Sequence, residues 1–148
     1  MSGTTQRDNA NRGYLKLDVW NSGMELTRFV TSLLGQAGGS DPADRLSRQT
    51  LDCAVSIPAN IAEGYCRRNI GEYLYFLNVA LGNLGSLMTR VIALREAAQI
   101  DQETFDWFDV QHAKIENELI TLIRSLEAKR RDEGWEDEAR EPREPYIH

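Results

Sequence analysis

The chain has very few of the residues that build metal and nucleophilic sites. Among its 148 residues only two are histidine and only two are cysteine. A di-iron centre in a helical bundle needs two Glu-x-x-His pairs and further inward carboxylates, whereas this chain has a single Asp109-x-x-His112 pair and one other histidine, His148, near its end. We therefore predict no metal, no cofactor and no catalytic site. His112 is interpreted as a hydrogen-bonded residue of the core or its edge.

The two cysteines and the hydropathy pattern indicate a compartment. Cys53 and Cys66 are thirteen residues apart on one predicted helix, which separates them by ~20 Å, far beyond the reach of a disulfide. Free thiols fit a reducing environment. Residues 1–13 have no apolar core of a signal peptide, and no apolar run approaches the ~20 residues of a membrane span. We expect a soluble, cytoplasmic protein without a membrane partner.

Strong positive charge is also lacking. The net charge is −6, and residues 132–148 account for −5 of it, with seven carboxylates and two arginines. The remaining 131 residues are almost neutral, which argues against a general polyanion binder. We interpret residues 1–13 as a disordered leader, 14–131 as one folded domain and 132–148 as an acidic disordered tail. An alternative for the tail is a polyanion mimic that covers a basic surface of its own chain.

Apolar residues repeat with the spacing of helices in the first half of the domain. A first helix is predicted over residues 19–34, with Asp18 as its cap, and a second after the acid cap and proline of Asp41-Pro42. Pro58 falls inside the second pattern, where proline normally breaks a helix. Because the apolar period continues in phase, we predict one continuous, kinked helix. Ser56, Asn60 or a water could satisfy the backbone carbonyl that Pro58 leaves without a donor. Alternatively, Asn60 and Glu63 could form polar contacts between subunits.

Two longer helices follow. Asn69-x-x-Glu72 resembles a capping box, and Asp101 is placed to cap the last helix. Both helices are about 30 residues, or ~45 Å, long. Short connections force neighbouring helices to be antiparallel. The predicted fold is all-α, an antiparallel up-down-up-down four-helix bundle with a proline kink in the second helix.

The third predicted helix has a second apolar stripe with a repeat of seven residues. Gly82 and Gly85 flatten the surface nearby. One interpretation is a wide core face. The other is burial against another subunit, since exposed apolar patches usually mark interfaces. The candidate interface residues are Leu74, Phe76, Leu81, Met88 and Ile92.

Several segments carry a family resemblance. Leu17–Trp20 resembles a helix opening, and the run Ala54-Val55-Ser56-Ile57-Pro58-Ala59-Asn60-Ile61-Ala62-Glu63-Gly64 is the most distinctive match, which continues through Arg67-Arg68 and Glu72-Tyr73. Over about residues 15–130 the chain resembles the four-helix-bundle family of 23S rRNA-intervening-sequence proteins. Relatives of that family include the accessory variability determinant of diversity-generating retroelements.

The resemblance implies the bundle, the in-phase proline kink and a homopentamer around a fivefold axis. For the accessory branch it also implies binding of RNA and of a reverse transcriptase through basic surface. This sequence departs from the pattern where many members carry two arginines, because Leu51, Asp52 and Cys53 stand there. Ile70 and Gly71 likewise replace basic residues. Both departures remove positive charge.

The expected topology brings several bases to one end of the bundle. That end holds the start of the first helix and the ends of the second and fourth, and there they could bind phosphates or simply complement helix dipoles. The candidate nucleic-acid-binding residues are Arg12, Lys16, Arg67, Arg68, Lys129, Arg130 and Arg131.

Taken together, these features lead us to expect a non-catalytic homo-oligomeric scaffold that is associated with RNA or with a nucleic-acid-processing protein. The alternative is a protein–protein adaptor that binds no nucleic acid.

Overall fold

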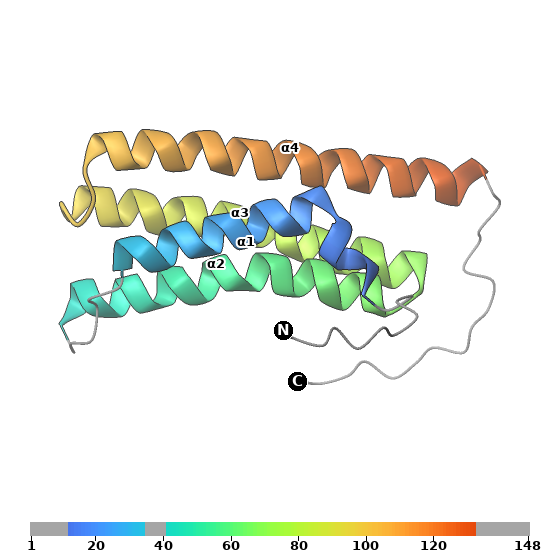
Figure 1. Cartoon of the computed structure of the whole chain (residues 1–148), viewed down its shortest axis with the longest axis horizontal. Coiled ribbons are helices and arrows are strands. Elements are labelled where there is room, and N and C mark those ends of the chain that lie inside the picture. The colour runs from blue at the N-terminus through green and yellow to red at the C-terminus, as the bar shows by residue number, and fades with distance from the viewer. Residues whose placement is uncertain (1–11, 35–40, 133–148) are drawn as a thin grey trace, which may run out of the picture.

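The computed structural model describes residues 12–34 and 41–132, which are all-α (Figure 1). A 3-10 turn, η1 (Gly13–Lys16), precedes four helices: α1 (Asp18–Leu34), α2 (Pro42–Cys66), α3 (Ile70–Glu96) and α4 (Gln102–Asp132). The predicted leader up to residue 11, the glycines after α1 and the tail beyond Asp132 lie outside the described residues.

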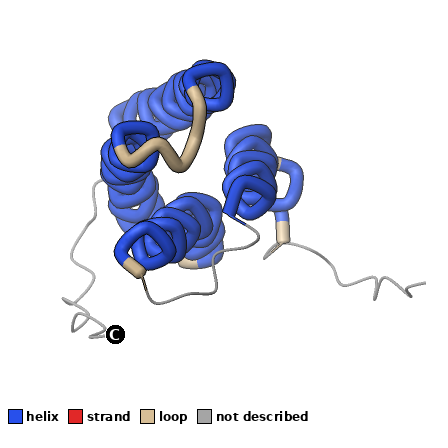
Figure 2. Tube along the Cα trace, turned by 90° about the vertical axis from the view of Figure 1, so that its left-hand side faces the viewer, coloured by secondary structure: helices blue, strands red, loops and turns tan. Residues whose placement is uncertain are grey.

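The four helices form one antiparallel bundle. Each helix packs against the next along the chain, and α4 returns to α1 to close the bundle, as the end-on view in Figure 2 shows. Helices α1 and α3 are therefore diagonal to each other. The predicted up-down-up-down fold is confirmed.

Side-chain caps begin three of the helices as the sequence predicts. The Asp41 carboxylate accepts hydrogen bonds from the backbone N–H groups of Ala43 and Asp44 at 2.9 and 3.1 Å. Asn69 accepts one from Glu72 N–H at 3.0 Å. Asp101 accepts one from Thr104 N–H at 2.8 Å, and hydrogen bonds from the side chain and backbone of Thr104 lower the pKa of Asp101.

The start of α1 differs from the prediction. Asp18 is the first residue of the helix rather than the residue before it, because η1 and Leu17 lead directly into the helix. Its carboxylate therefore lies in the first turn, where negative charge complements the helix dipole.

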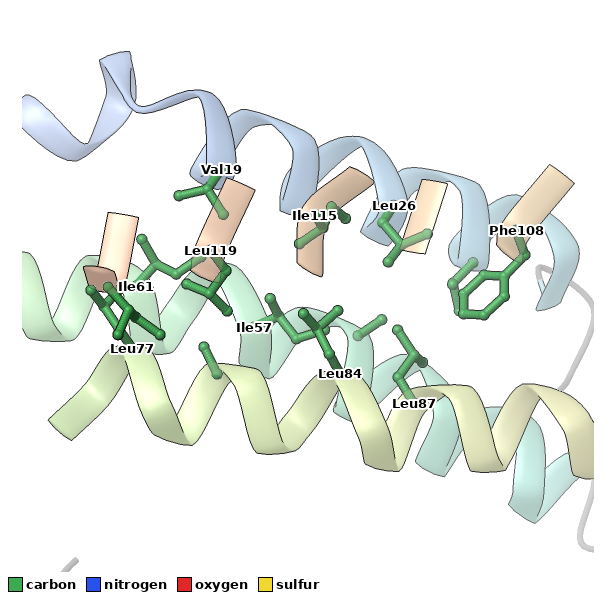
Figure 3. Close-up of a cluster of buried hydrophobic side chains, with 14 of the residues drawn as sticks. Val19, Leu26, Ile57, Ile61, Leu77, Leu84, Leu87, Phe108, Ile115 and Leu119 are labelled. Carbon is green, nitrogen blue, oxygen red and sulfur yellow. The ribbon is translucent and has the colours of Figure 1, made fainter. Parts of the chain in front are cut away.

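The core is a column of aliphatic side chains from all four helices (Figure 3). Leu77, Leu84 and Leu87 of α3 are fully buried, as is Phe108 of α4. Each such side chain contributes about 1.5–3 kcal/mol by leaving water. His112 is buried among them, with its Nε2 atom 2.7 Å from the Leu84 carbonyl oxygen. The interpretation of His112 as a hydrogen-bonded core residue is confirmed.

Helix α2 is continuous through Pro58, as predicted. Proline has no N–H group, so the Ala54 carbonyl, four residues earlier, loses its helical donor. The flanking side chains bond elsewhere: Ser56 Oγ donates to the Cys53 carbonyl at 2.5 Å, and Asn60 Nδ2 to the Ser56 carbonyl at 2.9 Å. Of the interpretations that the sequence left open, the one in which these two side chains satisfy the freed group therefore does not hold. Thr27 Oγ1 of α1 approaches the Ala54 oxygen, at 3.5 Å.

Candidate functional site

Aromatic rings join the elements at the end of the bundle where α2 ends. Tyr14 of η1 contacts the rings of Trp20 and Tyr65, with centroids 5.6 and 6.1 Å away. Tyr65 in turn contacts Tyr73 at 5.9 Å. A side chain at Gly13 would overlap the Tyr65 hydroxyl. These contacts hold η1 against α2 and place Arg12 and Lys16 at this end of the bundle.

Two of the seven predicted basic residues meet in one cavity. This cavity has a volume of about 220 Å³ and lies between the end of α2, the start of α3 and the end of α4. We call it the basic pocket. Arg68 lines it from the turn after α2 and Lys129 from α4, and no carboxylate of the described residues does. Its lining residues are Gly64, Tyr65, Arg68, Asn69, Ile70, Tyr73, Leu126 and Lys129.

The other predicted bases do not line the basic pocket. Arg67 forms an ion pair with Glu63 at 2.6 Å and lies over the ring of Phe76. Arg12, Lys16 and Arg131 are exposed, and Arg130 is half-buried in the last turn of α4. The structure thus brings the charges to the same end of the bundle but assembles only Arg68 and Lys129 into one cavity.

Tyr73 adds a buried hydroxyl to the basic pocket. Its oxygen is inaccessible to solvent and has no hydrogen-bond partner in the described part of the chain. Burial, and secondly the neighbouring Tyr65, raise the pKa of Tyr73 to about 12. The phenol therefore keeps its proton at neutral pH and remains a hydrogen-bond donor.

A larger cleft of about 480 Å³ lies between the start of α1 and the second half of α4. We call it the acidic groove, because Asp18 and Glu118 line it and no basic residue does. Ser22 Oγ donates to one Glu118 carboxylate oxygen at 3.3 Å. The other oxygen is buried and unpaired within the described ranges. Polyanion contact on this side of α4 is therefore disfavoured.

The predicted interface stripe packs largely within its own chain. Leu74 is only 7% exposed, and Leu81 and Met88 are partly buried against the core. Phe76 lies beneath Arg67 and is half-buried, as is Ile92. For Leu74 the interpretation as a wide core face is the one that holds.

The free side of α3 is a different set of residues. We call it the outer face of α3, and every member is exposed. It consists of Tyr75, Asn78, Gly82, Gly85, Ser86 and Thr89. A Cβ atom added at Gly82 or Gly85 would meet nothing within 4 Å. In the sequence, this face could have been recognised from the absence of any charged residue between Glu72 and Arg90.

Helix α3 is also the one described helix that is long and apolar enough to cross a membrane, and 33% of its apolar window is buried in the bundle. This differs from the expectation that no segment reaches that length. Because Leu77, Leu84 and Leu87 form the bundle core, we attribute this apolarity to packing. Most of the window is nevertheless not buried by this chain alone.

The two cysteines lie in different surroundings on α2. Cys53 is half-buried, with its sulfur 3.4 Å from the Asn83 carbonyl oxygen, while Cys66 is exposed at the end of α2. Within residues 12–34 and 41–132, no three His, Cys, Asp or Glu side chains lie close enough together to hold a metal ion.

The chain matches a described protein family over most of its length. The sequence model of a family described as 23S rRNA-intervening sequence protein matches residues 15–121. This range includes α1, α2 and α3 and most of α4. No curated protein matches the chain.

Proposed function

The chain belongs to the 23S rRNA-intervening sequence protein family, and we propose that it is a non-catalytic scaffold that assembles, as a pentamer, through the outer face of α3. The observation that carries this proposal is a water-facing helical surface without any charge. From Tyr73 to Thr89, a helical length of ~25 Å, no side chain is ionisable at neutral pH.

Such a surface is unusual for a helix that faces only solvent. The solvent side of an amphipathic helix normally carries charged residues, and each glycine inside a helix costs about 1 kcal/mol relative to alanine. Gly82 and Gly85 bring no packing benefit within residues 12–34 and 41–132, because none of these residues lies within 4 Å of a Cβ added at either glycine. Their benefit would come from a neighbouring subunit, whose backbone or side chains could approach closely over a flat surface.

A second copy of the chain is the occupant that this surface suits. The folded body is nearly neutral, so copies do not repel each other strongly. A closed ring needs a second, different surface on each chain. Exposed apolar residues of α4, Trp107 at 46% and Val110 at 65%, supply one. The free cysteines support a cytoplasmic location.

Replacing Gly85 with glutamate tests this assembly. We expect the wild-type chain to give the mass of five copies by light scattering after size exclusion, and Gly85→Glu to give the mass of one. The charge would be buried without a partner in the interface, whereas the monomer has open space for the side chain. Thr31→Glu is the matched control, because Thr31 is exposed on the diagonal helix α1 and should leave the mass unchanged.

Two outcomes would contradict the proposal. A wild-type chain that remains a folded monomer at high concentration would rule out self-assembly. An unchanged mass for Gly85→Glu would show that copies meet elsewhere. In the first case the same uncharged face would favour the alternative function, a protein adaptor that binds a different protein and no nucleic acid.

A second candidate function is nucleic-acid association at the basic end of the bundle. It is favoured by Arg68 and Lys129, which converge on one pocket, and a ring of copies would multiply these charges. We expect filter binding at low salt to retain RNA, with retention lost as salt rises or as polyphosphate competes, because counterion release drives such contacts. If no RNA is retained, or if retention changes with neither salt nor polyphosphate, the proposal that the basic end binds RNA through its charges is contradicted.

A further inference from the structure

We propose that the basic pocket is a binding site for the phosphate group of a small phosphate monoester, such as a mononucleotide or the 5′-phosphorylated end of an RNA. The inference concerns a cavity within one chain. It therefore stands whether or not copies assemble, and it gives nucleic-acid association a particular chemical group.

The charges of the pocket suit a dianion. Arg68 follows the end of α2, and Lys129 lies in the last turn of α4, so that two cations from separate parts of the chain line one cavity. Glu63, a nearby carboxylate of α2, is paired with Arg67 instead. A guanidinium and an ammonium without a carboxylate in the lining are suited to bind phosphate oxygens through charge-assisted hydrogen bonds.

Neutral donors complete the set. The Tyr73 hydroxyl is buried, protonated and without a partner among the described residues. The Asn69 carbonyl oxygen is used in capping α3, which leaves its amide NH2 group on the same side chain as a donor. A buried hydroxyl without a partner is destabilising. Because this oxygen is closed off from solvent, the Tyr73 side chain has to turn toward the cavity before a ligand oxygen can accept from it, and that contact would remove the penalty.

The remaining walls suit an organic substituent. Gly64, Tyr65, Ile70 and Leu126 line the rest of the cavity and carry no charge. Its volume of about 220 Å³ corresponds to roughly seven water molecules at liquid density. A phosphate group occupies part of this space and leaves room beside the Tyr65 ring for the atoms esterified to it. We therefore expect a monoester to bind more tightly than inorganic phosphate.

The backbone at Arg68 provides a sharp variant. Its φ is 56°, a conformation that glycine adopts more readily than arginine. Arg68→Gly thus removes the guanidinium without straining the turn. Tyr73→Phe removes only the hydroxyl and should raise the thermal midpoint of the free protein. Arg131→Met is the matched control, because Arg131 is an exposed cation of the same last turn that does not line the pocket.

The experiment is calorimetric titration of the full chain with inorganic phosphate, uridine 5′-monophosphate, uridine and acetate. We expect binding of the two phosphates, tighter for the nucleotide, and none of uridine or acetate. Arg68→Gly and Tyr73→Phe should each weaken nucleotide binding by about tenfold or more, while Arg131→Met changes it little. A purely structural Tyr73 would alter the thermal midpoint but not this affinity.

Short RNAs with a 5′-phosphate or a 5′-hydroxyl then distinguish the source of the phosphate. Preference for the phosphorylated end identifies nucleic-acid termini as ligands, and nucleotide binding without that preference identifies free mononucleotides. The proposal is overturned if neither phosphate binds, if acetate binds equally well, or if Arg68→Gly and Tyr73→Phe bind like the wild type. The mass by light scattering is read separately, so that failure of the pocket and failure of assembly are not confused.

Discussion

Two unusual stretches of the sequence, residues 54–64 of α2 and residues 73–89 of α3, have opposite relations to the bundle. In the α2 stretch the distinctive residues point inward. Ala54, Ile57, Ile61 and Gly64 are buried, and Pro58 lies against α1 at Gly23, where an added Cβ would be 3.4 Å from the proline ring. The packing of a single chain therefore accounts for this motif, and no ligand is needed to explain it.

The α3 stretch is explained only on one side. Its leucines at positions 77, 84 and 87 form the core. Its outer face exposes Tyr75 and two glycines, at which an added Cβ would have no described atom within 4 Å. Glycine therefore occurs in this chain for different reasons. Gly64 is required by a close helix contact within the chain, whereas Gly82 and Gly85 have no such contact among the described residues.

The largest change in stability is expected for a substitution of Ile57 in the α2 stretch. Its side chain is fully buried, so Ile57→Ala should lower the free energy of unfolding by about 2–5 kcal/mol through lost burial and a cavity. Urea denaturation followed by circular dichroism measures this. Val55, two residues away and 45% exposed, is the control, and Val55→Ala should change stability by about 0.5 kcal/mol or less. Equal losses would mean that the α2 motif does not face the core.

An intermediate effect is expected at Gly64. A Cβ atom there would lie 2.8 Å from the Phe76 Cβ and 3.2 Å from the Tyr73 carbonyl oxygen. Gly64→Ala should therefore push α2 and α3 apart and cost about 1–3 kcal/mol, despite the better helix propensity of alanine. Thermal unfolding is the measurement, and a stabilised variant would contradict the close contact.

The smallest change in stability is expected for a substitution of Gly85, and it should be stabilising. Gly85 has open space around it, so Gly85→Ala should raise the free energy of unfolding of the isolated chain by about 0.5–1 kcal/mol. Because its methyl group would stand in the proposed interface, Gly85→Ala should also weaken assembly, but less than the buried charge of Gly85→Glu, and light scattering over a range of concentrations measures both. Destabilisation of the isolated chain would show that the outer face of α3 packs against something within the chain.

Much of the fold could be predicted from local chemistry. Caps at Asp41, Asn69 and Asp101 depend on residues two or three positions away, so the sequence reveals them directly. The donor nearest the Ala54 carbonyl could not be found in this way, because Thr27 lies 27 residues earlier on another helix. Ser56 and Asn60, the sequence neighbours of Pro58, donate to other carbonyl groups instead.

The candidate site was less predictable. Helix direction placed the bases at one end, but which of them share a cavity depends on the rotation of each helix about its axis. Arg68 and Lys129 line the same cavity, whereas Arg67, the residue before Arg68, forms an ion pair with Glu63. The unpaired Tyr73 hydroxyl is likewise invisible in the sequence, since tyrosine on an apolar stripe usually finds a partner.

Four helices, three of their caps and the inward faces follow from the sequence alone, because helical period and capping are short-range properties of the chain. Only the packed bundle shows that Leu74 belongs to the core, that no described residue covers the uncharged side of α3, and that a basic pocket and an acidic groove lie at separate places. The physical reason is that burial and cavities arise between helices, where angles and distances are set by packing of the whole bundle.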